Sequence, residues 1–155
     1  MMTQKQLKPN ARHIARIWAM QALFKMPYVD SLSAAEVIPE FLAEESGYTP
    51  GGDVALFREL VQGVITHKEA VDGLLVGHVD RPLADLTPVE LAVLRIAVFE
   101  LCYRPSVPYR VVINEALELT KAFGATDGHR YVNGVLDVIA AEVRAVEVAA
   151  RAVKK

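Results

Sequence analysis

The hydrophobic pattern between Thr87 and Tyr103 predicts one long helix that is buried on most of its sides. Apolar residues repeat along one face at helical spacing, at Leu91, Leu94, Val98 and Leu101, and others fill the remaining sides. Thr87 supplies an N-cap oxygen, Pro88 fits the first helical position, and Glu90 completes a capping box. Arg104 precedes a proline and is pushed out of the helical region, so it ends the helix. We expect this helix to be the central post of the fold.

The same periodicity predicts further helices on both sides of this one. A polar, flexible segment over residues 1–9 precedes the first helix. The expected helices run from Asn10 to about Met26, from Ser33 to Glu45, from Asp53 toward Leu75, from Pro108 to a C′ glycine at Gly124, and onward from a cap at Thr126 or Asp127. Pro39 is expected to be a kink or boundary, and Gly73 is the candidate break in the third helix. No stretch alternates apolar and polar residues long enough for a strand. The pattern therefore predicts an all-α protein with a single domain over residues 1–155.

Length and composition narrow the class of protein. The chain has 155 residues, of which 52% are hydrophobic, enough for a core and too many for a disordered chain. No apolar run approaches the roughly 20 residues of a membrane span, and no signal peptide is apparent, so we expect a cytoplasmic protein. Cys102 is the only cysteine. It excludes a disulfide framework, and we expect it to be a small core residue.

Charge is distributed unevenly along the chain. The formal net charge is −2, which argues against nucleic-acid binding by bulk electrostatics. However, residues 1–29 hold five of the 17 Lys and Arg residues and none of the 19 Asp and Glu residues. A basic N-terminal segment therefore precedes an acidic body.

No motif for catalysis or cofactor binding is present. The chain has no Gly-rich phosphate loop in a strand–turn–helix setting and no Gly-x-Ser-x-Gly elbow. The histidines are scattered, at His13, His67, His78 and His129. No glutamate is followed by histidine three residues later, which excludes a di-iron bundle site. The sequence thus predicts no catalytic, metal or cofactor site.

The basic N-terminal helix is the first candidate for binding. Arg12 and Arg16 lie four residues apart and are expected to project together, with Lys5 and Lys8 nearby. The simplest interpretation is a solvated helix face, since such residues are common on surfaces. The functional interpretation is contact with the phosphates of a nucleic acid.

The segment from Asp127 to Gly134 is the second candidate. It can be a capped helix start with Tyr131 as a packing anchor. Alternatively, the N–H groups of a helix N-terminus attract an anion, and the aromatic ring gives a base a stacking surface.

At these residues the chain resembles the NusB family of bacterial transcription antitermination factors. The resemblance covers nearly the whole length and is strongest in these blocks: Arg81-Pro82-Leu83, Leu86-Thr87-Pro88-Val89-Glu90, Val93-Leu94-Arg95-Ile96-Ala97, Val107-Pro108-Tyr109, Val112-Ile113-Asn114-Glu115-Ala116, Ala122-Phe123-Gly124 and His129 to Asp137. It implies two packed three-helix bundles without enzymatic activity or cofactor. It also implies binding to the boxA element of ribosomal RNA transcripts, together with the ribosomal protein NusE, within an RNA polymerase antitermination complex.

The resemblance also assigns residues to this surface. The family's N-terminal arginine cluster falls on Arg12, His13, Ile14 and Arg16, and further RNA or complex positions fall on Arg95, Phe123, Asp127 and Tyr131. Positions near the NusE junction fall on Gln21, Phe24 and Glu90. His13 and Ile14 interrupt the family's run of arginines. Fewer cations lower the salt-dependent affinity, so we expect weak RNA binding without the partner.

The sequence suggests a mechanism and leaves alternatives open. RNA would cross the basic face of the first helix toward Phe123 and Tyr131, and NusE would dock near Glu90. The same fold occurs as the N-terminal RNA-binding domain of a ribosomal RNA cytosine methyltransferase. A dimeric helical adaptor with weakened RNA binding is the other alternative.

Overall fold

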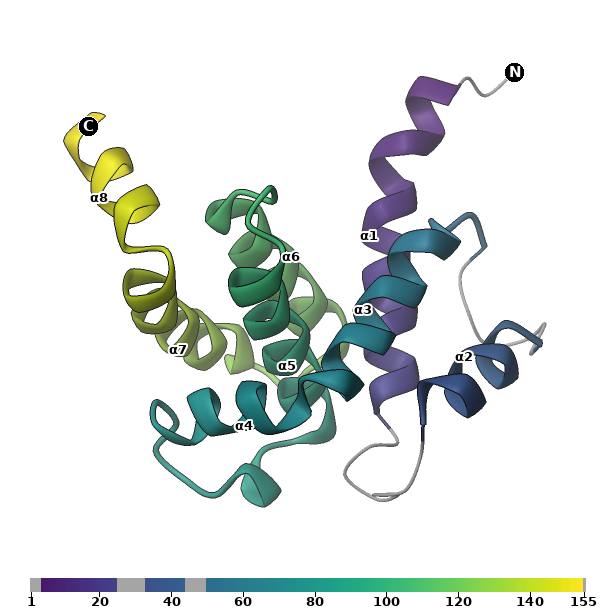
Figure 1. Ribbon diagram of the computed structural model, residues 1–155, viewed down its shortest axis with the longest axis horizontal. Helices are drawn as coiled ribbons and strands as arrows, with labels where there is room; N and C mark the ends of the chain where they lie inside the picture. Colours follow the sequence, from purple (N-terminus) through teal and green to yellow (C-terminus); the bar gives the residue numbers. More distant parts are fainter. Residues whose placement is uncertain (1–3, 25–32, 44–49, 155) are drawn as a thin grey trace. The chain divides into compact units, whose positions relative to one another are not determined.

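The computed structural model describes residues 4–24, 33–43 and 50–154, and the side chains of 4–10 and 154 lie outside that description. All regular structure in these ranges is helical (Figure 1), which confirms the predicted all-α class. The helices are α1 (Gln4–Leu23), α2 (Ala34–Ala43), α3 (Val54–Thr66), α4 (Lys68–Val76), the 3-10 turn η1 (Leu83–Asp85), α5 (Pro88–Tyr103), α6 (Tyr109–Phe123), α7 (Gly128–Val143) and α8 (Ala145–Lys154). The chain divides into two compact units, Met1–Thr66 and His67–Lys155.

In the first unit, α1 packs against α3, and α2 contacts both. The Trp18 ring is buried on α1 and meets Phe57 edge-on at 5.8 Å between ring centroids. A Cβ atom at Gly52 would lie 2.6 Å from the Trp18 ring, so only glycine fits there. The Asp53 N–H donates to the Ala11 carbonyl at 2.9 Å. The loop before α3 is therefore fixed against α1.

In the second unit, α5 is the central helix, as predicted. Every residue from Leu91 to Leu101 is buried, and α5 packs against α4, α6 and α7. The predicted capping box is confirmed. The Glu90 N–H donates to Thr87 Oγ1 at 3.1 Å, and the Thr87 N–H donates to Glu90 Oε1 at 3.2 Å.

Several predicted boundaries are wrong. Helix α1 begins at Gln4, well before the expected start at Asn10, because the polar residues of its first turns show no apolar period. It ends at Leu23 rather than Met26. Pro39 lies inside α2, so it is not a boundary. The predicted end of this helix at Glu45 lies outside the described residues.

Two more sequence expectations fail on particular contacts. The break between α3 and α4 lies at His67 and not at Gly73. The His67 ring stacks on Tyr103 at 3.9 Å between centroids, a tertiary contact that the local sequence does not encode. Cys102 is exposed, not part of the core.

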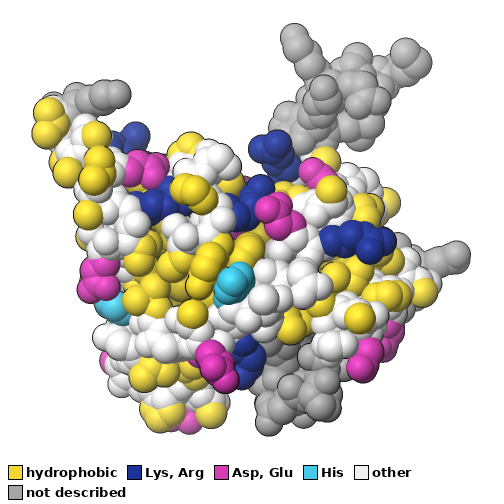
Figure 2. Space-filling model, in the orientation of Figure 1, with side chains coloured by type: hydrophobic (Ala, Val, Ile, Leu, Met, Phe, Trp, Pro, Cys, Tyr) yellow, Lys and Arg dark blue, Asp and Glu magenta, His cyan; other side chains and the backbone are white. Residues whose placement is uncertain are grey.

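Gly124, expected as the C′ glycine, is the C-cap residue of α6 and has extended backbone (φ −93°, ψ −178°). Glycine is needed there because a Cβ atom would lie 2.7 Å from the Thr120 carbonyl oxygen. The final helix is also interrupted, since α7 ends at Val143 and α8 begins at Ala145. Figure 2 shows apolar side chains exposed along α8, where Val146 and Val153 are 86% and 85% exposed.

Candidate nucleic-acid interface

The link between α6 and α7 forms the centre of the candidate site in the second unit. Phe123, the last residue of α6, is 43% exposed. Asp127 takes the N-cap position of α7 in a left-handed conformation (φ 67°), which Asp tolerates better than most residues. Its side chain makes no capping hydrogen bond and instead lies 3.7 Å from Arg130 Nε. The predicted cap position is therefore confirmed, but not the side-chain cap.

Helix α7 begins close to the start of α5. A Cβ atom at Gly128 would lie 3.3 Å from Glu90 Oε2 and from the Thr120 methyl group. The Gly128 N–H donates to the Ala125 carbonyl at 3.0 Å. The Glu90 carboxylate thus holds the cap of α5 with one oxygen and borders the N-terminus of α7 with the other.

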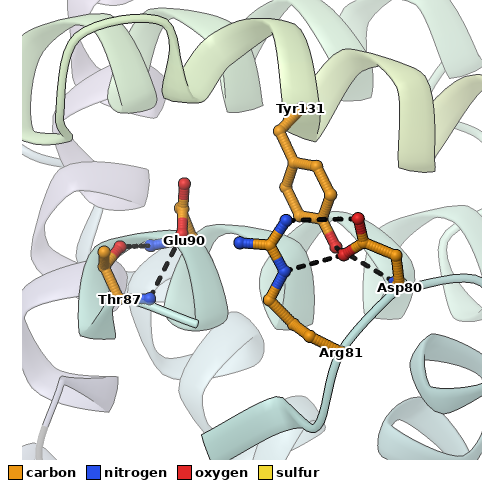
Figure 3. A network of polar contacts seen from close by, with 5 residues as sticks. All are labelled: Asp80, Arg81, Thr87, Glu90 and Tyr131. Atoms are coloured by element: carbon orange, nitrogen blue, oxygen red, sulfur yellow. Dashed lines mark hydrogen bonds and ion pairs between the residues drawn. The ribbon is translucent and has the colours of Figure 1, made fainter. Parts of the chain in front are cut away.

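Tyr131, in the first turns of α7, is held by two residues of the segment that precedes η1 (Figure 3). Its hydroxyl donates to Asp80 Oδ1 at 3.0 Å and accepts from the Asp80 N–H at 3.4 Å. Arg81 donates from Nε and Nη2 to the two Asp80 oxygens at 2.7 and 3.2 Å. The Arg81 guanidinium lies over the Tyr131 ring, 4.7 Å from its centroid. One face of the tyrosine is therefore covered by a cation.

The electrostatics of this network favour a neutral phenol beside a charged carboxylate. Hydrogen bonds from Arg81 and then from Tyr131 lower the pKa of Asp80. Partial burial raises the pKa of Tyr131, and the Asp80 carboxylate adds to that effect. Tyr131 therefore keeps its proton at neutral pH and donates a hydrogen bond to the Asp80 carboxylate, which orients the ring.

Arg95 is not an exposed cation. Its side chain is 6% exposed and donates from Nε and Nη2 to the two oxygens of Asp72, both at 2.9 Å. Its Nη1 is buried and has no hydrogen-bond partner among the described residues. The guanidinium thus joins α5 to α4, and its position does not suit direct contact with RNA.

In the first unit, the basic face of α1 is smaller than predicted. Arg12 is exposed, His13 is half-buried, and Arg16 is only 4% exposed. The expectation that Arg12 and Arg16 project together is therefore wrong, since Arg16 belongs to the buried side of α1. The side chains of Lys5 and Lys8 lie outside the described residues.

The residues assigned to the partner junction differ in accessibility. Phe24 is 37% exposed, directly after the end of α1. Gln21 is half-buried, and its Oε1 has no hydrogen-bond partner among the described residues. Glu90 is half-buried within its capping box.

Sequence reasoning missed Asp80 and Arg81 as parts of a site. Arg81 stands in the sequence only as part of the Arg81-Pro82-Leu83 block of the family resemblance, and Asp80 belongs to no motif. Their partner Tyr131 lies about 50 residues further along the chain, so no local pattern joins them. An adjacent acidic and basic pair before a proline is the only signal, and it is weak.

Metal binding and membrane insertion find no support among the residues described. Among the residues described, no group of three or more His, Cys, Asp or Glu side chains could hold a metal ion. In the same part of the chain, no helix combines the length and apolar character needed to cross a membrane.

Comparisons with known proteins agree with one another. The model of the NusB family matches residues 13–141. Transcription antitermination protein NusB of Shewanella loihica is 47% identical over 136 residues, or 88% of this chain and 99% of the relative. The protein of the same name from Coxiella burnetii is 47% identical over 135 residues, or 87% of this chain and 96% of the relative. A solved structure of T. maritima NusB is 28% identical with a TM-score of 0.72, over 84% of this chain and 91% of that one. With a fold, a family model and full-length relatives in agreement, this chain belongs to the NusB family.

Proposed function

We propose that this protein is an RNA-binding transcription antitermination factor. It binds the boxA element of ribosomal RNA transcripts together with NusE, as part of an RNA polymerase antitermination complex. The observation that carries the proposal is a tethered Tyr131 ring and an exposed Phe123, one on each side of the α6–α7 link, in a chain whose relatives are named for antitermination. The names of those relatives favour this function over that of a methyltransferase domain.

Single-stranded RNA suits this combination of groups. Specific recognition of unpaired RNA relies on bases stacked on aromatic rings and on hydrogen bonds to their edges. The Phe123 ring is 43% exposed, and the Tyr131 ring is held in one orientation. Phe123 is the proposed direct base-stacking position, and Tyr131 is the proposed aromatic support of a second base. Asp127, exposed between them in sequence, is the proposed acceptor for a base N–H.

Phosphate contacts come from the N-terminal helix. Arg12 is exposed and is the proposed direct contact, with His13, Lys5 and Lys8 as the other members of the group. Arg16 and Arg95 are buried, so we assign them to positioning their helices rather than to touching phosphate. Because few cations remain, the protein alone has little electrostatic affinity for RNA.

The partner supplies the missing affinity. A basic ribosomal protein neutralises phosphates and is attracted to a chain whose residues 30–155 are acidic overall. NusE would contact Gln21, Phe24 and Glu90. A homodimer that covers the same residues would compete with RNA.

The test is a titration of boxA RNA with the protein and NusE over a salt series, using wild type and Arg12→Ala. For Arg12→Ala we expect weaker binding and a plot of log K against log salt that is shallower by about 0.7, the value for one phosphate contact in a single strand. Arg58→Ala, which removes an exposed cation from α3, is the matched control and should leave the slope unchanged.

Two outcomes would contradict parts of this proposal. If wild type failed to bind boxA RNA with NusE at any salt concentration, the proposed function would be wrong. An adaptor role would then be favoured, and sedimentation would reveal whether it is a dimer. If wild type bound boxA RNA and Arg12→Ala showed the same salt dependence as wild type, the phosphate contact of α1 would be refuted and the proposed function would stand.

A further inference from the structure

The Arg81 guanidinium is held in a fixed plane at the surface of the second unit. Asp80 engages Nε and Nη2 at 2.7 and 3.2 Å, and the Tyr131 ring lies 4.7 Å below. The third nitrogen, Nη1, has no hydrogen bond to any described residue. In Figure 3 it points away from Asp80, and the Arg81 side chain is 44% exposed.

This arrangement is more than an ordinary surface ion pair. An exposed pair of adjacent residues contributes little to stability, and the side chains of Arg81 and Asp80 are 44% and 66% exposed. The same carboxylate also accepts from the Tyr131 hydroxyl at 3.0 Å. Carboxylate, guanidinium and phenol therefore restrain one another, although Asp80 and Tyr131 lie on different elements.

The restrained guanidinium has one face on the tyrosine and a second face without a ring contact among the described residues. A planar guanidinium stacks on aromatic systems, including nucleobases, and its N–H groups donate in fixed directions. A lysine ammonium at the same place would keep the charge but lose the plane.

We propose that Arg81 is a further RNA-contacting residue: a base of the bound strand stacks on the outer face of its guanidinium, and Nη1 donates to an acceptor oxygen of that nucleotide. This inference rests on the proposed RNA-binding function and adds a named contact to it. Tyr131 and Arg81 then form one platform, with Tyr131 beneath and the base above. Asp80 is a positioning residue, because it holds both members in place and does not touch the RNA.

The experiment is a titration of boxA RNA with the protein and NusE, comparing wild type, Arg81→Gln and Arg81→Lys. Stacking of one base on such a platform is worth about 5- to 150-fold in affinity, and we expect a loss within that range in both variants. Arg110→Gln is the control, since it removes one exposed cation near the opposite end of α6 from Phe123. It should change affinity by less than about twofold, and each variant should keep the wild-type melting temperature.

A double-mutant cycle tests whether Arg81 and Tyr131 act together. Residues that form one platform lose affinity non-additively, so Arg81→Gln should cost less than about twofold when Tyr131→Leu is already present. This coupling is measured on RNA binding, and a purely structural role of Arg81 would not produce it at unchanged melting temperature.

Three outcomes would overturn the inference while leaving the proposed function intact. These are wild-type affinity in Arg81→Gln, wild-type affinity in Arg81→Lys, which would indicate a simple charge, and fully additive losses in the cycle. Absence of binding by wild type itself would instead refute the proposed function, and this inference with it.

Discussion

Replacing Arg144 by methionine tests how the C-terminal end of α5 is stabilised. Arg144 is 8% exposed and lies at the break between α7 and α8. Its Nε donates to the buried Leu101 carbonyl at 2.8 Å. In a continuing helix that carbonyl would accept from the residue four positions later, which here is Pro105 and has no N–H. Arg144 therefore supplies the donor that the proline lacks.

The expected loss can be worked out from these contacts. Leaving the buried Leu101 oxygen without a donor costs about 1–3 kcal/mol. The Arg144 contact with Glu147 Oε1, whose side chain is 37% exposed, adds up to about 1 kcal/mol. The Glu100 and Arg104 carbonyls also accept from Arg144, but each keeps a backbone donor of its own. We therefore expect Arg144→Met to lower the free energy of unfolding by about 1–4 kcal/mol.

The assay is urea denaturation followed by helical circular dichroism, with hydrogen exchange of α5 amides as the local measure. Arg144→Lys keeps one donor and should lose about half as much. Arg151→Met, on the exposed part of α8, is the control and should change stability by less than about 0.5 kcal/mol. If Arg144→Met were as stable as Arg151→Met, solvent would be satisfying the Leu101 carbonyl, and the proposed helix cap would be refuted.

Two further predictions concern a buried cation and a histidine. Arg95→Met should destabilise the protein by about 2–3 kcal/mol, because it leaves the Asp72 carboxylate without its main partner, while RNA affinity per folded molecule changes less than about twofold. A tenfold loss of RNA affinity at unchanged stability would instead make Arg95 a direct contact. His78 is bonded through Nδ1 to a backbone carbonyl and through Nε2 to Glu142 at 3.0 Å, and these two bonds raise its pKa above 6.5. The stabilisation is therefore complete below pH 6.5 and lost as pH rises through the raised pKa, so the melting temperatures of wild type and Glu142→Gln should differ at pH 5.5 and converge by about pH 8.5. An equal difference at both pH values would contradict this assignment.

Local chemistry made α5 the most predictable part of the fold. Thr87 and Glu90 form the capping box from residues three apart, and the apolar period continues until Arg104. Both signals lie within one helix, so no knowledge of distant residues is needed. The helix breaks at His67 and Arg144 could not be predicted in the same way. His67 stacks on Tyr103 and Arg144 donates to the Leu101 carbonyl, and both partners lie far away in the sequence.

The candidate site was only partly predictable for the same reason. The aromatic and acidic residues around the α6–α7 link stand together in the sequence, and Phe123 and Asp127 are indeed exposed. Cations are harder to place, because lysine and arginine are usually exposed whatever their neighbours. Arg95 is buried since Asp72, on another helix, compensates its charge.

From the residue pattern alone follow the helical class, the central helix and its cap, and the family to which the chain belongs. The helical class, the central helix and its cap depend on periodicity and on contacts between residues a few positions apart, whereas the family follows from the matched blocks of residues. Tertiary packing alone settles which cations reach solvent and which groups meet Tyr131. Burial of a charge and the meeting of Asp80, Arg81 and Tyr131 depend on distances between separate helices, which no short stretch of sequence specifies.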